Sequence, residues 1–160
     1  MLRPGRRLAV DVGQARVGLA LTDLHAILAS PLGTVARLES TTDSVDSVIR
    51  AITEVGEILE IYVGVPINLQ GKSTLSTDDA VSFAEELQEA SGLEVRLIDE
   101  RLTTSMANNQ LKQIGKSQMD ARSTFDQMAA VAILEFALSV EKNTGLAPGL
   151  SIQEWRERNE

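Results

Sequence analysis

Apolar runs near the N-terminus predict three closely spaced β-strands. The run from Arg7 to Asp11 ends in an acid, and a second run from Arg16 to Thr22 follows after a tight turn at residues 13–15. A third run, from Leu28 to Val35, contains Pro31, which has no amide hydrogen to donate and therefore suits an edge strand or a bulge. Because the connections are so short, we expect an antiparallel meander.

Beyond about residue 40, helical spacing of the apolar positions alternates with short continuous apolar runs. The first helix carries Val45 to Val55, with Thr41 or Thr42 as its N-cap. The elements expected after it are a strand at Ile61 to Val65, a helix at about Ser76 to Ala90, a strand at Glu94 to Ile98, and helices at about Thr104 to Ile114 and Ser123 to Glu141. The last helix should bury Phe125, Met128, Ala129, Ala132, Ile133, Phe136 and Val140.

This order of elements predicts an α/β fold. It implies an antiparallel meander of three strands, extended by two parallel strands through crossover helices. That is the order of a ribonuclease H-like fold, a mixed five-stranded sheet flanked by helices. Residues 1–142 should form this single domain, and residues 143–160 a linker followed by a charged C-terminal tail or short helix.

The composition excludes some kinds of site and constrains the location. The chain has 160 residues and no cysteine, so it can form neither a disulfide framework nor a thiolate metal site. The basic N-terminal residues precede no long apolar stretch, so we expect no secretion signal and no membrane span. A soluble, cytoplasmic protein is therefore expected, while the sequence leaves its oligomeric state open.

The net charge of −8 argues at first against a nucleic-acid partner, but the charges are segregated. Residues 39–60 carry six acids and one base, and residues 78–91 carry five acids and no base. Residues 1–18 carry four arginines against one acid, and residues 96–122 carry five bases against three acids. This pattern is typical of acidic solvated helices beside a local basic surface.

Acidic residues stand at the ends of two predicted strands. Asp11 ends the first strand beside a glycine turn, where a metal ion and a phosphate can approach the backbone; an aspartate that caps the turn is an equally good interpretation. Glu100 follows the fifth strand, and ligands gather at the carboxyl ends of parallel strands. The alternative is an ordinary charged loop, with Thr104 as the N-cap of the next helix.

A third acid, Asp126, stands near the start of the last predicted helix. Residues 123–126 fit a variant of the capping box, so Asp126 would either stabilise the helix terminus, project a carboxylate toward the sheet edge, or do both. Carboxylates from distant parts of the chain suit Mg²⁺, which prefers oxygen ligands and keeps several waters. Two such ions about 3.5–4 Å apart could hydrolyse a phosphodiester. His25, the only histidine, is best interpreted as a surface residue.

The loop after the fourth strand, residues 64–72, could contact a phosphate through its backbone amides and through Asn68 and Lys72. Its spacing is not that of a P-loop, and a plain loop is at least as good an interpretation. The substrate-binding residues expected across the basic and polar segments are Arg16, Asn68, Lys72, Arg101 and Arg122.

Four segments together resemble a known family. They are Asp11-Val12-Gly13 through Val17-Gly18-Leu19-Ala20; Val63-Gly64-Val65-Pro66 with Asn68 and Gly71-Lys72; Asp99-Glu100-Arg101-Leu102-Thr103-Thr104; and Asp126 with Ala129-Ala130 and Ile133-Leu134. In this order, over roughly residues 6–140, they resemble the YqgF (RuvX) family of pre-16S ribosomal RNA nucleases, which is related to Holliday-junction resolvases. The resemblance implies a ribonuclease H-like domain that binds Mg²⁺ or Mn²⁺ through Asp11, Glu100 and Asp126.

The reaction that the resemblance implies is phosphodiester hydrolysis in maturation of the 5′ end of 16S rRNA, with ribosomal precursor particles as partners. Resolution of branched DNA is the alternative. Related junction resolvases tend to carry a further acid three residues before the helix carboxylate, where this chain has Ser123, so RNA is favoured. An actin-like ATPase would need a second domain, for which 160 residues leave no room. A non-catalytic RNA-binding regulatory protein remains the rival interpretation.

Overall fold

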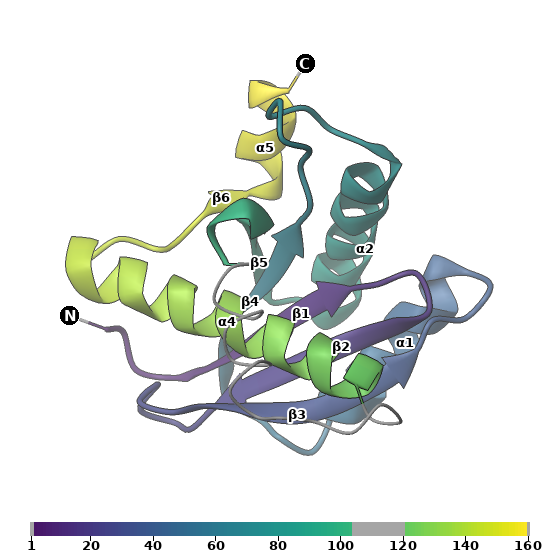
Figure 1. Cartoon of the computed structure of the whole chain (residues 1–160). Helices are drawn as coiled ribbons and strands as arrows, with labels where there is room; N and C mark the ends of the chain where they lie inside the picture. The colour runs from purple at the N-terminus through teal and green to yellow at the C-terminus, as the bar shows by residue number, and fades with distance from the viewer. Residues whose placement is uncertain (1, 104–120, 160) are drawn as a thin grey trace.

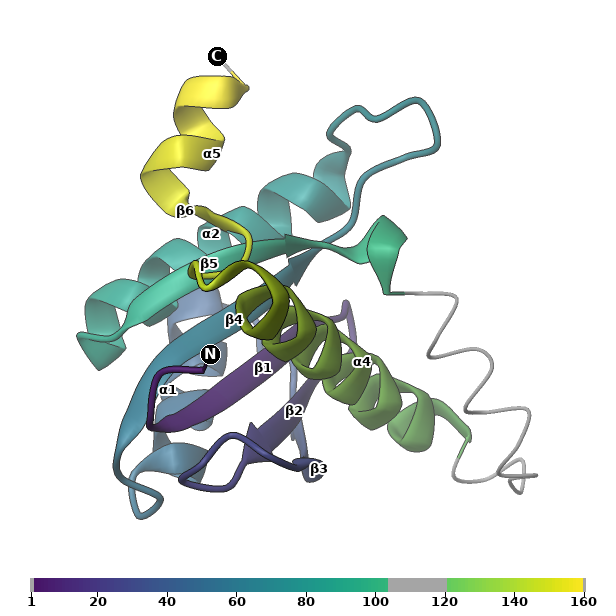
Figure 2. The same cartoon turned by 90° about the vertical axis from the view of Figure 1, so that its left-hand side faces the viewer.

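One twisted sheet separates two layers of helices. The computed structural model describes residues 2–103 and 121–159, except for the side chains of residues 121–124. Helix α4 (Ala121–Thr144) crosses one face of the sheet, and helices α1 (Thr41–Ile52) and α2 (Leu75–Ser91) cover the other (Figures 1 and 2). No helix within the described ranges has the length and apolar character needed to cross a membrane.

The sheet has six strands in the order β3-β2-β1-β4-β5-β6. They are β1 (Arg6–Val12), β2 (Arg16–Thr22), β3 (Ala29–Ala36), β4 (Ile58–Val65), β5 (Glu94–Asp99) and β6 (Leu150–Ser151). Strands β1 to β3 pair antiparallel, whereas β4 pairs parallel with both β1 and β5. The predicted ribonuclease H-like arrangement of a meander plus two parallel strands is therefore confirmed. The short antiparallel β6 is an addition that the sequence did not predict.

Strand β3 lies at the edge of the sheet, as the proline within it predicts. The pairing register between β2 and β3 shifts between Leu19 and Ala20, opposite Gly33 and Pro31. Gly33 has φ 144°, a backbone conformation that side chains disfavour. The missing amide hydrogen of Pro31 therefore falls at a bulge, where it interrupts no regular ladder.

The helix ends differ from the sequence predictions by a few residues. Ser40, rather than Thr41 or Thr42, caps α1, because its side chain accepts a hydrogen bond from the backbone N–H of Asp43. Thr74 caps α2, which ends at Gly92 in the left-handed conformation (φ 72°). The helix predicted at residues 104–114 lies outside the described residues. A single 3₁₀ turn, η1 (Glu100–Leu102), follows β5 directly.

Each face of the sheet has its own apolar core, because successive strand residues point to opposite faces. Leu8 and Val10 of β1 pack toward α1 and α2, whereas Ala9 packs toward α4. Helix α4 is buried from Ala130 to Leu134. The prediction that Phe125 points inward is wrong, since its side chain is 37% exposed. Apolar residues surround α4 on most sides, so their spacing did not identify its buried face.

The C-terminal residues, expected to be a linker followed by a charged tail or short helix, add a strand and a short helix to the domain. Strand β6 pairs with β5, and the short helix α5 (Ile152–Arg158) follows it (Figure 1). Trp155 packs against the core on the α2 side, and Arg156 forms an ion pair with Glu85 of α2. The Arg96 guanidinium donates hydrogen bonds to the carbonyl oxygens of Pro148 and Gly149. The segment therefore covers the outer edge of β5.

A buried network of charged groups joins β1 and β4 to the C-terminal half of α4. Arg7 and Glu141 are almost fully buried, and their side chains form an ion pair of 2.9 Å. Arg3 bridges Glu141 at 2.6 Å and Glu60 at 2.7 Å. The hydroxyl of Tyr62 donates to Glu60. The buried Arg7, Glu60 and Glu141 and the partly exposed Arg3 thus balance one another, and removal of one buried charge leaves another uncompensated.

We expect Glu141→Gln to lower the free energy of unfolding by about 3 kcal/mol, because the buried Arg7 guanidinium loses its counter-charge. Urea denaturation monitored by circular dichroism measures this difference. The matched control is Glu89→Gln on the exposed surface of α2, which should change stability by less than about 0.5 kcal/mol. Equal stability of the two variants would contradict a structural role for the network.

Candidate functional site

Three acids from distant parts of the chain lie at one end of the sheet on its α4 side. Asp11 is the second-to-last residue of β1, and Glu100 begins η1 directly after β5. Asp126 lies in α4 beyond its first turn. The interpretation that Asp126 stabilises the helix terminus is wrong, because α4 already begins at Ala121. The carboxylate of Asp126 therefore projects from the body of the helix.

Two glycines make room for these acids on the neighbouring strands. Gly18 of β2 is paired with Asp11, and a side chain there would collide with the carbonyl oxygen of Asp126. Gly64 of β4 lies one position beyond the Val10–Val63 pair on the other side of β1. A Cβ at Gly64 would lie 2.7 Å from Oε1 of Glu100. Asp11 therefore lies between two strand positions that have no side chain. Asp126 occupies the space over Gly18, and Glu100 occupies the space over Gly64.

Asp11 and Glu100 form a partly buried carboxyl pair that shares a hydrogen bond. Burial, the hydrogen bond to Asp11 and the negative charges of Asp11 and Asp99 together raise the pKa of Glu100 to about 9. Burial also raises the pKa of Asp11, the hydrogen bond from Glu100 opposes that rise, and the charge of Asp126 adds to it. At neutral pH, Glu100 therefore holds the proton and donates it to Asp11.

Asp126 is held by an arginine that was expected to bind substrate. The Nε of Arg16, at the start of β2, donates to Oδ2 of Asp126 at 2.7 Å. Both side chains are only partly exposed, at 31% and 16%. The pair places a positive charge beside the acids, where a phosphate would compete with Asp126 for the guanidinium.

The carboxylates of this site meet the requirements of a hard divalent cation only in part. Among residues 2–103 and 121–159, no three His, Asp or Glu side chains already stand in an arrangement that could hold a metal ion. Asp11 and Glu100 nevertheless bring carboxyl oxygens together in a partly buried place, and Mg²⁺ can bind through one or two carboxylates while it keeps several waters. Asp126 is near enough to act electrostatically on Asp11 and is oriented by Arg16.

The remaining predicted substrate-binding residues fall on two neighbouring loops. Arg101 pairs with Asp99 at 2.7 Å and is largely exposed, and its Nη1 lies 3.4 Å from where a Cβ of Gly71 would be. The side-chain oxygen of Asn68 accepts hydrogen bonds from the backbone N–H groups of Gln70 and Lys72, so Asn68 shapes its own loop.

Two further residues complete the comparison with the sequence predictions. The side chain of Lys72 is exposed on the same loop as Asn68, whereas the side chain of Arg122 lies outside the described residues.

The sequence did not single out Arg37, whose Nη1 donates to the carbonyl oxygen of Gly13 and whose guanidinium pairs with Asp79. Arg37 thereby holds the turn next to Asp11 against α2. An arginine in a loop after an edge strand gives no signal of this role in the sequence.

We expect the stability of the metal-free protein to fall as the pH rises, because of Glu100. Between the ordinary pKa of 4.5 and about 9, folded Glu100 binds a proton that the unfolded chain has lost, so deprotonation favours unfolding. Glu100→Gln should flatten this dependence and be the more stable protein at alkaline pH. Urea denaturation in a chelator across this range measures both effects. Glu39→Gln, at an exposed position, is the control, and parallel curves for all three proteins would contradict the assignment.

We expect Gly18→Ala to lower the free energy of unfolding by about 1–3 kcal/mol, because the new methyl group meets the helix backbone at Asp126. Gly64→Ala should cost less, since its methyl group meets mainly the ends of the Glu100 and Ile133 side chains, which can move. Thermal unfolding of both variants gives the comparison. A Gly18→Ala variant as stable as the wild type would show that α4 does not lie so close to β2.

Comparison with known proteins supports the assignment of the fold. Residues 5–140 match the RuvX family, which is described as a Holliday junction resolvase. A protein of Clavibacter michiganensis named "Putative pre-16S rRNA nuclease" is 43% identical over 148 residues, which are 92% of this chain and 91% of that protein. A protein of the same name from Leifsonia xyli is also 43% identical, over 95% of this chain and 97% of its own length.

The fold is shared with a solved resolvase. RuvC of Thermus thermophilus in complex with a Holliday junction substrate superposes with a TM-score of 0.56 and 14% sequence identity, covering 91% of this chain and 99% of RuvC. A second Thermus thermophilus RuvC structure gives a TM-score of 0.53. Because the family match covers residues 5–140 and both curated relatives are 43% identical over almost their whole length, the chain belongs to the RuvX family.

Proposed function

We propose that this protein is a divalent-metal-dependent nuclease that hydrolyses a phosphodiester bond in maturation of the 5′ end of pre-16S rRNA. The observation that carries the proposal is the partly buried carboxyl pair of Asp11 and Glu100 at the ends of parallel strands, with Asp126 beside it. Ligands of open α/β sheets bind at this edge. Two carboxyl groups forced together without a cation are a costly arrangement that a binding site explains.

Each acid has a distinct role in the proposed reaction. Asp11 and Glu100 would hold Mg²⁺ or Mn²⁺, and Glu100 would give up its proton to solvent when it becomes a ligand. Asp126 would complete the acidic set when Arg16 turns to a phosphate oxygen of the substrate. The bound metal would supply activation of a water and stabilisation of the leaving oxygen.

The substrate would approach along the exposed loops next to the acids. Arg101 is held by Asp99 in a solvent-exposed position beside Gly71, and Lys72 follows on the loop of Gly71. Both cations can exchange their present surroundings for phosphate oxygens. Arg122 is proposed for the same surface from its place in the sequence alone. We place the reaction in the cytoplasm, on ribosomal precursor particles.

RNA is the preferred substrate, and branched DNA is the second candidate. The names of the Clavibacter and Leifsonia relatives refer to pre-16S rRNA. Position 123 carries a serine, where related junction resolvases tend to carry a fourth acid. The family description and the shared fold with RuvC favour the second candidate. Cleavage rates on a precursor RNA and on a four-way DNA junction of equal strand length would separate the two.

We expect Asp11→Asn to reduce Mg²⁺-dependent cleavage of a pre-16S rRNA 5′ fragment by at least about 100-fold, since loss of an outer-shell partner alone costs 10–100-fold at metal sites. The fold should remain intact, because the substitution preserves shape and removes a repelling charge. Gel analysis of the cleaved RNA measures the rate, and Asp46→Asn on exposed α1 is the matched control.

Full activity of Asp11→Asn would overturn the nuclease proposal and favour the non-catalytic RNA-binding interpretation. Faster cleavage of the DNA junction than of the RNA would instead keep the nuclease and replace its substrate. Isothermal titration of the metal-free protein with Mn²⁺ adds a readout that needs no substrate. Asp11→Asn should weaken Mn²⁺ binding, whereas Asp46→Asn should not.

A further inference from the structure

The turn between β1 and β2 carries two residues of the candidate site. Asp11 lies two positions before Gly13, and Arg16 lies three positions after it. The N–H of Gly13 donates to the carbonyl oxygen of Arg16, and a Cβ at Gly13 would lie 2.6 Å from that oxygen. The turn is therefore tight, so a displacement of Gly13 would move Asp11 and Arg16 together.

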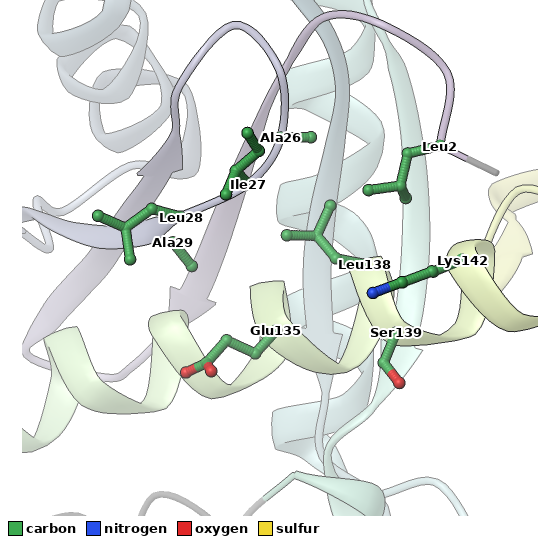
Figure 3. Close-up of a pocket in the computed structure, with 9 residues that line it drawn as sticks. All are labelled: Leu2, Ala26, Ile27, Leu28, Ala29, Glu135, Leu138, Ser139 and Lys142. Atoms are coloured by element: carbon green, nitrogen blue, oxygen red, sulfur yellow. The ribbon is translucent and has the colours of Figure 1, made fainter.

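Packing on α4 is uneven along β2. Toward the turn, Gly18 lets the backbone of α4 lie directly on the strand. Beyond the other end of β2, a hollow of about 440 Å³ separates residues 26–29 from Leu138 of α4 (Figure 3). The end of β2 at the turn is therefore the closely packed end, where no free space absorbs a displacement.

On the α2 side of the sheet, Arg37 holds the turn. Its backbone N–H donates to the carbonyl oxygen of Ala15 at 2.9 Å, and its Nη1 donates to that of Gly13 at 3.0 Å. The side chain of Arg37 is only 12% exposed, and its guanidinium lies over the ring of Phe83 of α2, 5.4 Å from the ring centroid. Arg37 therefore contacts the turn through both its backbone and its side chain.

Asp79 of α2 fixes the other side of this guanidinium. Nη1 and Nη2 of Arg37 donate to its two carboxylate oxygens at 2.8 and 2.7 Å, an arrangement that fixes orientation as well as distance. Two residues earlier on α2, the hydroxyl of the buried Thr77 donates to the carbonyl oxygen of Pro66, where the loop that carries Lys72 begins. The first turns of α2 therefore hold the β1–β2 turn and this loop at the same time.

The Arg37–Asp79 pair is poorly arranged for stability alone. The Nε of Arg37 is buried and has no hydrogen-bond partner in the part of the chain that the structure describes, which costs free energy. The side chain of Asp79 is 37% exposed, so water weakens the attraction. Apolar side chains of similar volume can often replace a buried ion pair without loss of stability. They cannot replace the hydrogen bond to the carbonyl oxygen of Gly13, which fixes the turn.

We propose that Arg37 and Asp79 are positioning residues for the candidate site. They set the place of Asp11 and Arg16 relative to Lys72 on the loop after β4. The inference rests on the proposed nuclease function, in which Asp11 holds the metal ion and the two cations contact phosphate. The pair itself contacts neither the metal ion nor the substrate, and its contribution is a fixed spacing between the acids and the phosphate-binding cations.

Arg37→Met tests the proposal, because methionine fills the space but cannot donate to Gly13 or Asp79. At saturating Mn²⁺ and saturating pre-16S rRNA 5′ fragment, we expect kcat to fall about tenfold or more, since the misplacement persists when both are bound. Isothermal titration of the metal-free protein should show the Mn²⁺ dissociation constant raised about tenfold. Arg37→Lys keeps the charge without the planar fork of two nitrogens, so its values should be intermediate.

Hydrogen exchange followed by mass spectrometry locates the effect within the chain. The backbone amides of residues 11–17 should exchange about tenfold faster in Arg37→Met, because the turn opens more often once its anchor is removed. The matched control is Arg156→Met, which removes another arginine that pairs with an acid of α2, Glu85, six residues beyond Asp79. This control should change neither kcat, nor Mn²⁺ affinity, nor exchange of the turn.

A pair with only a structural role would lower the thermal unfolding midpoint and leave kcat, Mn²⁺ affinity and exchange of the turn as in the wild type, and that result overturns the proposal. If Arg37→Met does not fold, Asp79→Asn gives the same comparison, and wild-type values there overturn it equally. A wild type that cleaves no RNA refutes the nuclease function instead. Exchange of the turn and the Mn²⁺ titration then still decide whether Arg37 positions it.

Discussion

The structure depends on a partly buried contact between two carboxyl groups that would repel each other if both were charged. Asp11 belongs to β1 and Glu100 follows β5, which is separated from β1 by β4, and the two carboxyl groups share one proton in the absence of a cation. Above the ordinary pKa of a glutamate, the unfolded chain has lost the proton that the folded pair keeps, so a rise in pH lowers the free energy of unfolding. A divalent ion would replace the proton and turn the repulsion into a shared attraction, so the same contact links stability, pH and metal binding.

Helix α4 is positioned from both of its ends so that this contact has a third acid beside it. Near its start, the absence of a side chain at Gly18 lets the backbone at Asp126 lie directly on β2. Near its end, Glu141 is fixed by the buried guanidinium of Arg7. Both fixed points include strands of the central meander, so a shift of α4 along its axis would disturb packing at one end and an ion pair at the other. Close packing makes such shifts costly.

The sequence could predict the acids at strand ends because strand ends are marked by local patterns. Asp11 follows a buried run, and Glu100 follows another, so the order of elements was sufficient to bring them to one edge. The pairing of Arg16 with Asp126 could not be predicted, because 110 residues separate them and each has several plausible partners. Strand β6 was missed for a related reason: two residues carry no periodicity, and only the exposed edge of β5 makes them a strand.

Helix α4 also shows why a helix that is apolar on most sides is hard to interpret from sequence. Its inner side packs on the sheet, its first half carries Asp126, and its second half carries Glu141. These demands fall on different sides of one helix, so its apolar residues cannot follow a single stripe.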